Sequence, residues 1–491
     1  MAFRPLIAIC GTTGVGKSNL AIEIALSFSH FKNLPWKGAR IINADAMQVY
    51  AGMDIITNKV PLSERQGIEH LLMGFKSPTE QYVVGQWVRD ALKAVEDAHN
   101  ENHVPIVVGG TSYWIQHLLF PNRLVRDMAT EESAGKHTST MSEDLTRLIS
   151  SLPSELLDLF NSLPDPAPDA DTDPEAAYAL YKLLKVVDPF VAERWHWKDT
   201  RKVLRSLRII RETGRRPSEM IDEQSRDHVR PRFNTLCFWV YADPEVLRPR
   251  LDLRIDKMVE RGMLNEVRSL REMTASNHEG NGGSDFTFGV FQSIGYREFH
   301  RYLSLQNPTE KDYQTALDNM KTSTRQYAKK QVSWLRNKLL PALYASNVEG
   351  DLSHTYLLDA TDLANWNANV QDPALQITNA FLVRKPLPDP YSICDTANTM
   401  LRVEPKPTDP SAVLLARRKV ICPECTIDPS QPFMVEEGKE WSDHLTSRAH
   451  KYSIRKRTQA SRIEMYKRRG SQASPIKPNP EVDISTSLLE R

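Results

Sequence analysis

Short apolar runs alternate with amphipathic stretches over the first 120 residues. Residues 6–10, 39–44 and 104–108 are mainly apolar runs of strand length, and each is followed at once by glycine or a polar residue. Between them, residues 19–28 and 85–99 repeat apolar side chains at helical spacing. Strands that alternate with helices form parallel sheets with right-handed crossovers. The pattern therefore predicts an α/β core built on a parallel sheet.

The pattern changes further along the chain. Residues 143–159 and 175–187 have helical spacing and alternate with polar, Pro- and Asp-rich stretches, which indicates a mainly helical insertion. Residues 233–241 predict a strand that returns to the sheet, and residues 244–274 and 312–339 predict long helices. The predicted domains are the first part of the α/β core at 1–122, the helical insertion at 123–230, the return strand and C-terminal helices of the core at 231–345, a linker at 346–411, a Cys/His module at 412–466 and a disordered tail at 467–491.

Composition excludes several classes of protein. The 491 residues are 40% apolar, which is too high for a wholly disordered chain. Five cysteines make no disulfide framework, and no apolar run reaches the length of a membrane span. We expect a cytoplasmic monomer without membrane contact, and the acid-free start leaves a mitochondrial pool open. The net charge of +1 hides a basic stretch at 448–469, for which contact with RNA phosphates and a nuclear import signal are two roles that do not exclude each other.

A complete phosphate-loop motif follows the first predicted strand. It reads Gly11-Thr12-Thr13-Gly14-Val15-Gly16-Lys17-Ser18. Its backbone N–H groups and the helix N-terminus favour phosphate oxygens, the lysine adds a full charge, and the Ser18 hydroxyl suits Mg²⁺. The alternative is a glycine-rich turn without a ligand. No acid ends the third strand, which is followed by Gly109, and Asp45 is the strand-end acid nearby. This argues against an ordinary ATP-hydrolysing motor.

Two cysteines and two histidines near the C-terminus have the spacing of a metal site. Cys422, Cys425, His444 and His450 form C-x2-C-x18-H-x5-H. Thiolate and imidazole ligands suit tetrahedral Zn²⁺, so we predict a zinc-dependent module that folds around the ion. The alternative is two unrelated pairs of residues.

An ordered series of motifs resembles the tRNA dimethylallyltransferase family, also called tRNA isopentenyltransferases. Besides the phosphate loop, the series comprises 42–50, 56–59, 70–72, 107–113, 199–207, 213–218, 254–262, 294–298, and 327–336, and the C-terminal Cys/His module resembles the eukaryotic branch. The resemblance covers about residues 6–340. The chain departs from it at Ala46, where the family usually has serine, and at Lys330, where the family often has arginine.

The resemblance implies transfer of a dimethylallyl group from dimethylallyl diphosphate to N6 of adenosine 37, beside the anticodon of tRNA. It implies that Lys17, Arg254 and Mg²⁺ on Ser18 stabilise the leaving diphosphate. Asp45 would be the general base or would orient the amine, and Thr111 would bind near the leaving-group oxygen or the adenine. Ala46, Met47 and Gln48 would contact the extruded base.

The resemblance also places the tRNA anticodon stem-loop against two further regions. The residues are Arg201, Lys202 and Arg205 in one region and Gln292, Gly295, Tyr296 and Arg297 in the other. Tyr296 would stack on RNA or bind phosphate. Each of these residues also has a purely structural alternative: a helix N-cap for Asp45, a turn residue for Thr111, simple packing for Met47 and Gln48, and solvated helix faces for Arg254 and Arg201. The alternative functions are a phosphate-loop kinase or ATPase with an RNA-binding zinc finger, and a non-catalytic RNA-binding regulator.

Overall fold

The structure is a computed structural model that describes residues 3–31, 34–121, 141–226, 230–277, 289–347, 352–403 and 410–471. The chain forms two compact units, and each is assembled from two separate stretches of sequence. The first unit, here the core unit, holds residues 1–132 and 223–410. The second, here the helical unit, holds residues 133–222 and 411–491. In the described part of the chain, no helix is both long and apolar enough to cross a membrane.

The core unit is built on a six-stranded parallel sheet with the order β3-β2-β4-β1-β5-β6. The strands are β1 (Pro5–Gly11), β2 (Gly38–Asn43), β3 (His70–Leu71), β4 (His103–Val108), β5 (Asn234–Tyr241) and β6 (Ser353–Asp359). Pairing of β1 with β4 ends at Ile9 and Val108, so the loops that follow both strands leave the same edge of the sheet. The prediction of a parallel-sheet α/β fold is confirmed.

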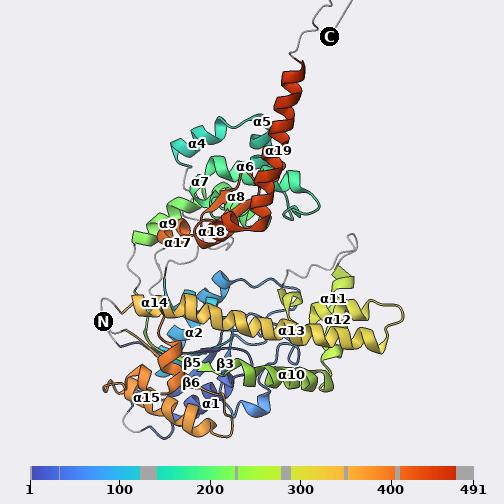
Figure 1. The fold of residues 1–491 in the computed structure, drawn as a ribbon. Helices are drawn as coiled ribbons and strands as arrows, with labels where there is room; N and C mark the ends of the chain where they lie inside the picture. The colour runs from blue at the N-terminus through green and yellow to red at the C-terminus, as the bar shows by residue number, and fades with distance from the viewer. Residues whose placement is uncertain are drawn as a thin grey trace, which may run out of the picture. The chain divides into compact units, whose positions relative to one another are not determined.

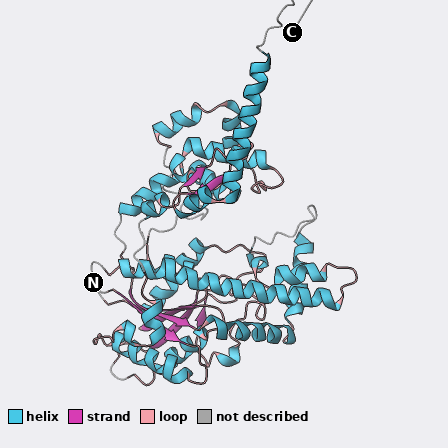
Figure 2. Cartoon of the chain, viewed as in Figure 1, coloured by secondary structure: helices cyan, strands magenta, loops and turns pink. Residues whose placement is uncertain are grey.

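Alternating side chains of the strands face two hydrophobic cores. Leu6, Ala8 and Cys10 of β1 belong to one core, while Ile7 and Ile9 belong to the other. Strands buried on both faces read as continuous apolar runs, which is why β1, β4 and β5 are visible in the sequence. Figure 2 shows the sheet enclosed by helices in the core unit.

Helices cover the sheet, and the longest of them, α13, runs beside α10 (Figure 1). The helices are α1 (Lys17–Ser27), α2 (Val84–Asn100), α3 (Ser112–Leu119), α10 (Pro244–Glu260), α11 (Met263–Asn277), α12 (Tyr296–Leu303), α13 (Glu310–Trp334), α14 (Leu340–Ala345), α15 (Asp372–Leu382) and α16 (Asp395–Met400). The long helices α10 and α13 lie side by side (Figure 1), joined by ion pairs from Arg325 to Asp252 at 2.7 Å and from Lys321 to Asp256 at 2.6 Å. The predicted helix at 244–274 is interrupted at Gly262, whose φ of +95° lies in the left-handed region.

The predicted linker at 346–411 is wrong for most of its length. Residues 353–401 contain β6, α15 and α16, and β6 pairs in register with β5, with Leu357 opposite Trp239. The error arose because the Pro-rich composition after residue 386 suggested a linker. The residues before it form β6, an edge strand of the sheet, by pairing with β5, which lies more than 100 residues earlier in the sequence.

The helical unit joins the insertion to the Cys/His module. Its elements are α4 (Glu143–Ser150), α5 (Ser154–Asn161), α6 (Pro174–Val187), α7 (Pro189–Ala192), α8 (Thr200–Thr213), α9 (Pro217–Arg226, the last turn of which belongs to the core unit), α17 (Pro410–Leu415), β7 (Lys419–Ile421), β8 (Met434–Glu436), α18 (Lys439–Thr446) and α19 (Arg448–Ser471). Leu414 and Met434 belong to the same hydrophobic core as the insertion helices. The Trp197 indole N–H donates to the Pro432 carbonyl oxygen at 2.8 Å. The module therefore packs on the insertion rather than standing apart from it.

The predicted disordered tail at 467–491 begins too early, because α19 continues to Ser471. Residues 472–491 lie outside the described residues, as do 122–140, which include much of the polar stretch expected before the insertion helices.

Candidate active site

A cavity of about 560 Å³ lies where β1, β2 and β4 end. Ligands of parallel α/β sheets bind at this carboxyl edge, because the loops that follow the strands converge there. The lining includes Thr13, Gly14, Gly16, Lys17, Ser18, Asn43, Asp45, Ala46, Met47, Gln48, Thr111, Arg254, Met258, Gln292, Met320, Tyr327 and Gln331. The structure thus brings together most of the candidates predicted in the core unit.

The phosphate loop turns tightly between β1 and α1. A Cβ on Gly11 would lie 2.3 Å from the Val240 carbonyl oxygen, and one on Gly16 would lie 2.6 Å from the ring of Trp366. Gly16 also has a φ of +89°, so glycine is required there on both grounds. Gly11, Thr12 and Val15 belong to the loop but are not among the residues that line the cavity. Glycine at these approaches keeps the loop backbone close to the sheet and open toward the cavity.

Trp366 supports the loop from outside. Its indole N–H lies 2.9 and 3.1 Å from the two carboxylate oxygens of Glu23, on α1. This tryptophan belongs to the stretch predicted as a linker, so its contact with the phosphate loop was missed.

Two buried cations face the cavity. Burial lowers the pKa of Lys17 to about 8, with Asp45 raising it and Arg254 lowering it further. Burial also lowers the pKa of Arg254, whose Nε atom is buried and has no hydrogen-bond partner in the described structure. Lys17 Nζ donates to the Thr12 carbonyl oxygen at 2.6 Å. Two cations and one carboxylate, Asp45, leave this part of the cavity with excess positive charge, which favours an anion.

Asp45 and Thr111 are held by hydrogen bonds within and between the loops that follow β2 and β4. The Met47 amide donates to Asp45 Oδ1 at 3.0 Å, and the Ala46 amide donates to the Thr111 hydroxyl at 3.1 Å. A Cβ on Gly109 would lie 2.2 Å from the Ala44 carbonyl, so glycine is needed for this approach. One Asp45 oxygen thus caps a turn, but no helix begins here, so the alternative of a helix N-cap is wrong. The other oxygen, Oδ2, lies near Gly110, and both residues line the cavity.

Helix α13 supplies two cavity residues to which sequence reasoning gave no role. Gln331 contacts both the phosphate loop and the turn after β4. The Tyr327 hydroxyl interacts with the side chains of Thr111 and Gln331, and burial followed by the charge of Asp45 raises the tyrosine pKa. Both lie in the 327–336 motif, so the motif marked the region without showing what the side chains contact.

The loop after Asp45 is fixed by polar contacts from outside it. Gln48 Nε2 donates to the carbonyl oxygens of Thr57 and Asn58 at 3.1 and 3.2 Å. Glu266, on α11, accepts from three consecutive amides at 2.8–3.2 Å, those of residues 54, 55 and 56. The side-chain amide nitrogen of Gln48 is therefore engaged by the protein, and the residue lines the cavity.

The predicted RNA-contacting residues divide into three groups. Gln292 lines the cavity, and Arg297 is exposed at the start of α12. Tyr296 is fully buried and packs against Phe291 at a ring distance of 5.3 Å, so the expectation that its ring stacks on RNA is wrong. It is the first residue of α12 and faces the core, which the motif does not reveal. Gly295, with a φ of +105°, is also buried and shapes the turn before the helix.

The third group lies in the helical unit. Arg201, Lys202 and Arg205 are exposed on α8, and Lys202 Nζ lies 5.0 Å from the centre of the Trp195 ring and 3.2 Å from Asp199. Spacing of one helical turn places Arg201 and Arg205 on the same side of α8.

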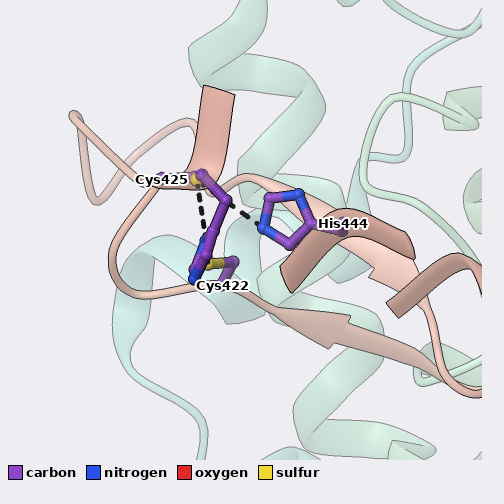
Figure 3. A group of neighbouring side chains, drawn as sticks. Cys422, Cys425 and His444 are labelled. Atoms are coloured by element: carbon purple, nitrogen blue, oxygen red, sulfur yellow. Dashed lines mark hydrogen bonds between the residues drawn. The ribbon is translucent and has the colours of Figure 1, made fainter. Parts of the chain in front are cut away.

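The four predicted metal ligands meet in the helical unit. The ligand atoms of Cys422, Cys425, His444 and His450 all lie within 4.8 Å of one another. Cys425 Sγ is 3.6 Å from His444 Nε2 and 3.4 Å from His450 Nδ1, and Cys422 Sγ is 3.5 Å from the same Nδ1. Figure 3 shows Cys422, Cys425 and His444 converging beside the hairpin that β7 and β8 form by antiparallel pairing. The cluster has the composition and the spacing to hold one metal ion.

Comparisons with known proteins show which family the chain is similar to. The family model described as IPP transferase matches residues 48–338. The chain is 35% identical to a tRNA dimethylallyltransferase of Schizosaccharomyces pombe, over 92% of this chain and 96% of the relative. It is 34% identical to a tRNA dimethylallyltransferase of Saccharomyces cerevisiae, over 94% of this chain and 95% of the relative. A solved eukaryotic dimethylallyltransferase that acts on tRNA superposes with a TM-score of 0.72 at 32% identity, covering 94% of this chain and all of the other.

Proposed function

The chain belongs to the IPP transferase family, and more closely to its tRNA dimethylallyltransferases, and on that premise we propose that it transfers a dimethylallyl group from dimethylallyl diphosphate to N6 of adenosine 37 in tRNA. The observation that carries the proposal is the cavity itself. It combines a phosphate loop, two buried cations and a carboxylate within reach of one ligand.

The cations suit the leaving group. As the bond between the allylic carbon and diphosphate breaks, negative charge grows on the diphosphate oxygens. Lys17 and Arg254 line the cavity together with Gly14, Gly16 and Ser18 of the phosphate loop, where that charge would develop. Donors that are already in place stabilise such charge without reorganisation. The Ser18 hydroxyl lines the same cavity, and its oxygen suits Mg²⁺, which when bound would supply further positive charge for the diphosphate.

Asp45 suits the other half of the reaction. The new bond forms between N6 and the allylic carbon, and a proton must leave N6. Asp45 Oδ1 is occupied by the Met47 amide, whereas Oδ2 lies near Gly110 and would accept the proton. Thr111, whose hydroxyl accepts from the Ala46 amide and contacts the Tyr327 hydroxyl, lines the cavity and would bind near the leaving-group oxygen or the adenine. The Gln48 carbonyl oxygen would read the base.

The Cys/His cluster suits zinc. Bonds of about 2.3 Å to sulfur and about 2.0 Å to nitrogen at tetrahedral angles place sulfur and nitrogen about 3.5 Å apart. The three separations of 3.4–3.6 Å match this value. Zinc held by Cys422, Cys425, His444 and His450 would stabilise the hairpin and α18.

Basic side chains of the helical unit suit the tRNA backbone. Arg201, Lys202 and Arg205 on α8 are exposed, as is the first part of α19, which carries Arg448 and Lys451. Contacts with phosphates provide affinity and salt dependence but little sequence choice. Arg297 would add a contact from the core unit.

Mass spectrometry of tRNA nucleosides tests the proposal. Purified protein is incubated with tRNA, dimethylallyl diphosphate and Mg²⁺, and N6-isopentenyladenosine is expected at position 37. Reactions without donor and with a tRNA lacking adenosine 37 are the controls. Absence of product together with nucleotide hydrolysis in the absence of tRNA would instead establish the kinase or ATPase alternative.

A further inference from the structure

We propose that Gln331 is a positioning residue that fixes the separation between the phosphate loop and the turn carrying Thr111. The inference rests on the proposed function, because its consequence is the distance between the leaving diphosphate and the groups that receive the amine. Neither composition nor motif spacing assigned Gln331 a role.

Both ends of the Gln331 side-chain amide are occupied by backbone. Its Oε1 accepts from the Thr13 amide at 2.9 Å, and its Nε2 donates to the Gly110 carbonyl oxygen at 3.0 Å. An N–H can only donate and a carbonyl can only accept, so these partners determine which end of the amide is oxygen. The side chain is 5% exposed, and buried hydrogen bonds of this kind are costly to leave unmade.

The two loops that Gln331 joins come from neighbouring strands and then diverge. The last backbone hydrogen bond between them runs from the Gly109 amide to the Ile9 carbonyl oxygen at 3.3 Å. Beyond it, the chain after β1 becomes the phosphate loop, and the chain after β4 becomes the turn that carries Thr111. Gln331 spans the gap that opens between them.

One end of this bridge lies next to the reacting groups. A Cβ on Gly110 would lie 2.5 Å from Gln331 Nε2 and 3.3 Å from Asp45 Oδ2. The other end holds Thr13, next to Gly14 of the phosphate cradle. Reacting atoms must be held about 3–3.5 Å apart for efficient transfer, and a misplacement of about 1 Å costs on the order of 10²-fold in rate. A side chain that ties both loops therefore acts on the chemical step.

Helix α13 makes the bridge rigid. Met320, Thr324, Tyr327 and Gln331 all line the cavity, and their spacing of four, three and four residues places them on one face of the helix. At 1.5 Å per residue this face spans roughly 16 Å, from the phosphate loop at Gln331 to the apolar contact of Met320 with Gly295. The ion pairs from α13 to Asp252 and Asp256 on α10 hold the helix against the opposite wall of the cavity.

The test is Gln331→Met, which keeps the length of the side chain and removes the hydrogen bonds to both loops, together with the contact to the Tyr327 hydroxyl. Single-turnover transfer with saturating donor and tRNA is expected to fall at least about tenfold, and the donor Kd to rise a few-fold. The tRNA Kd is expected to stay within twofold. Gln314→Met is the matched control, because Gln314 lies on the exposed side of the same helix and bonds only Glu310 among the described contacts. It should retain full activity.

A second variant keeps the inference testable if Gln331→Met does not fold. Gln331→Asn keeps the polarity but is one methylene too short to reach both loops, and it should show the same loss of single-turnover rate. The inference is overturned if either folded variant transfers at the wild-type rate, or if the loss equals the fraction of inactive protein found by titrating donor sites. A wild-type protein that forms no isopentenyladenosine would defeat the proposed function instead, so the two failures are distinguishable.

Discussion

The buried ammonium of Lys17 predicts a specific dependence of donor binding on pH. Burial lowers its pKa from 10.5 to about 8 in the absence of a ligand. The difference of 2.5 between these values corresponds to about 3 kcal/mol that disfavours the charged amine, at 1.36 kcal/mol per pKa unit. A bound diphosphate would offset this cost and keep the amine protonated. Donor binding above pH 8 must therefore take up a proton.

The expected size follows from the fraction of charged lysine. The amine is about 90% protonated at pH 7 and about 10% at pH 9, so the donor Kd should be about tenfold weaker at pH 9. Folding stability should respond in the opposite direction. The unfolded chain holds more protons on this amine between pH 8 and 10.5, so the contribution of Lys17 to stability rises with pH in that window.

Competition binding with a non-reacting thiolodiphosphate analogue of the donor measures this effect between pH 7 and 9. The second ionisation of a phosphate group, with a pKa of about 6, lies below the window. Lys17→Arg is the control, since guanidinium stays charged throughout and should abolish most of the pH dependence. A wild-type Kd that is constant from pH 7 to 9, or an equal loss in Lys17→Arg, would refute the reasoning.

Three further predictions follow from the contacts of the site and of the Cys/His module. Asp45→Asn should retain tRNA binding and cut transfer by on the order of 10²-fold or more, measured by single turnover, and an unchanged rate would exclude the general base. Glu266→Gln should lower kcat/KM for tRNA by about tenfold with the donor Kd unchanged, because the three loop amides of residues 54–56 would no longer donate to a charged carboxylate. Equal effects on both substrates would contradict this prediction. Removal of zinc by a chelator, or Cys425→Ser, should lower the thermal stability of the insertion helices as well as tRNA affinity, because Leu414 and Met434 share their core. Hydrogen exchange over α6 and α8 measures the former, and unchanged protection would show that the two parts are independent.

Local patterns were sufficient to predict much of the fold. The strands that hold residues 6–10 and 104–108 are buried on both faces, so their apolar runs are continuous. The glycines of the phosphate loop show in the sequence where the backbone makes a tight turn. The four Cys/His ligands were also evident, because spacing alone limits how such residues can meet.

Contacts between distant residues could not be predicted in this way. Gln331 meets Gly110 across 221 positions of sequence and Thr13 across 318. Nothing in the local pattern of α13 marks one glutamine as a bridge. Tyr296 shows the opposite error, because a motif shared with a family identifies a residue without saying whether its side chain faces solvent or the core. The strand β6 was missed because its identity depends on β5.

The split origin of the helical unit has a consequence for how the protein is made. Residues 133–222 leave the ribosome about 190 positions before residue 411, which begins the segment that completes their core. At roughly 5–20 residues per second, the apolar surface that later receives Leu414 and Met434 waits about 10–40 seconds for its partner. The nascent insertion therefore exposes apolar surface during this interval, and a premature stop shortly before residue 411 would leave that surface uncovered.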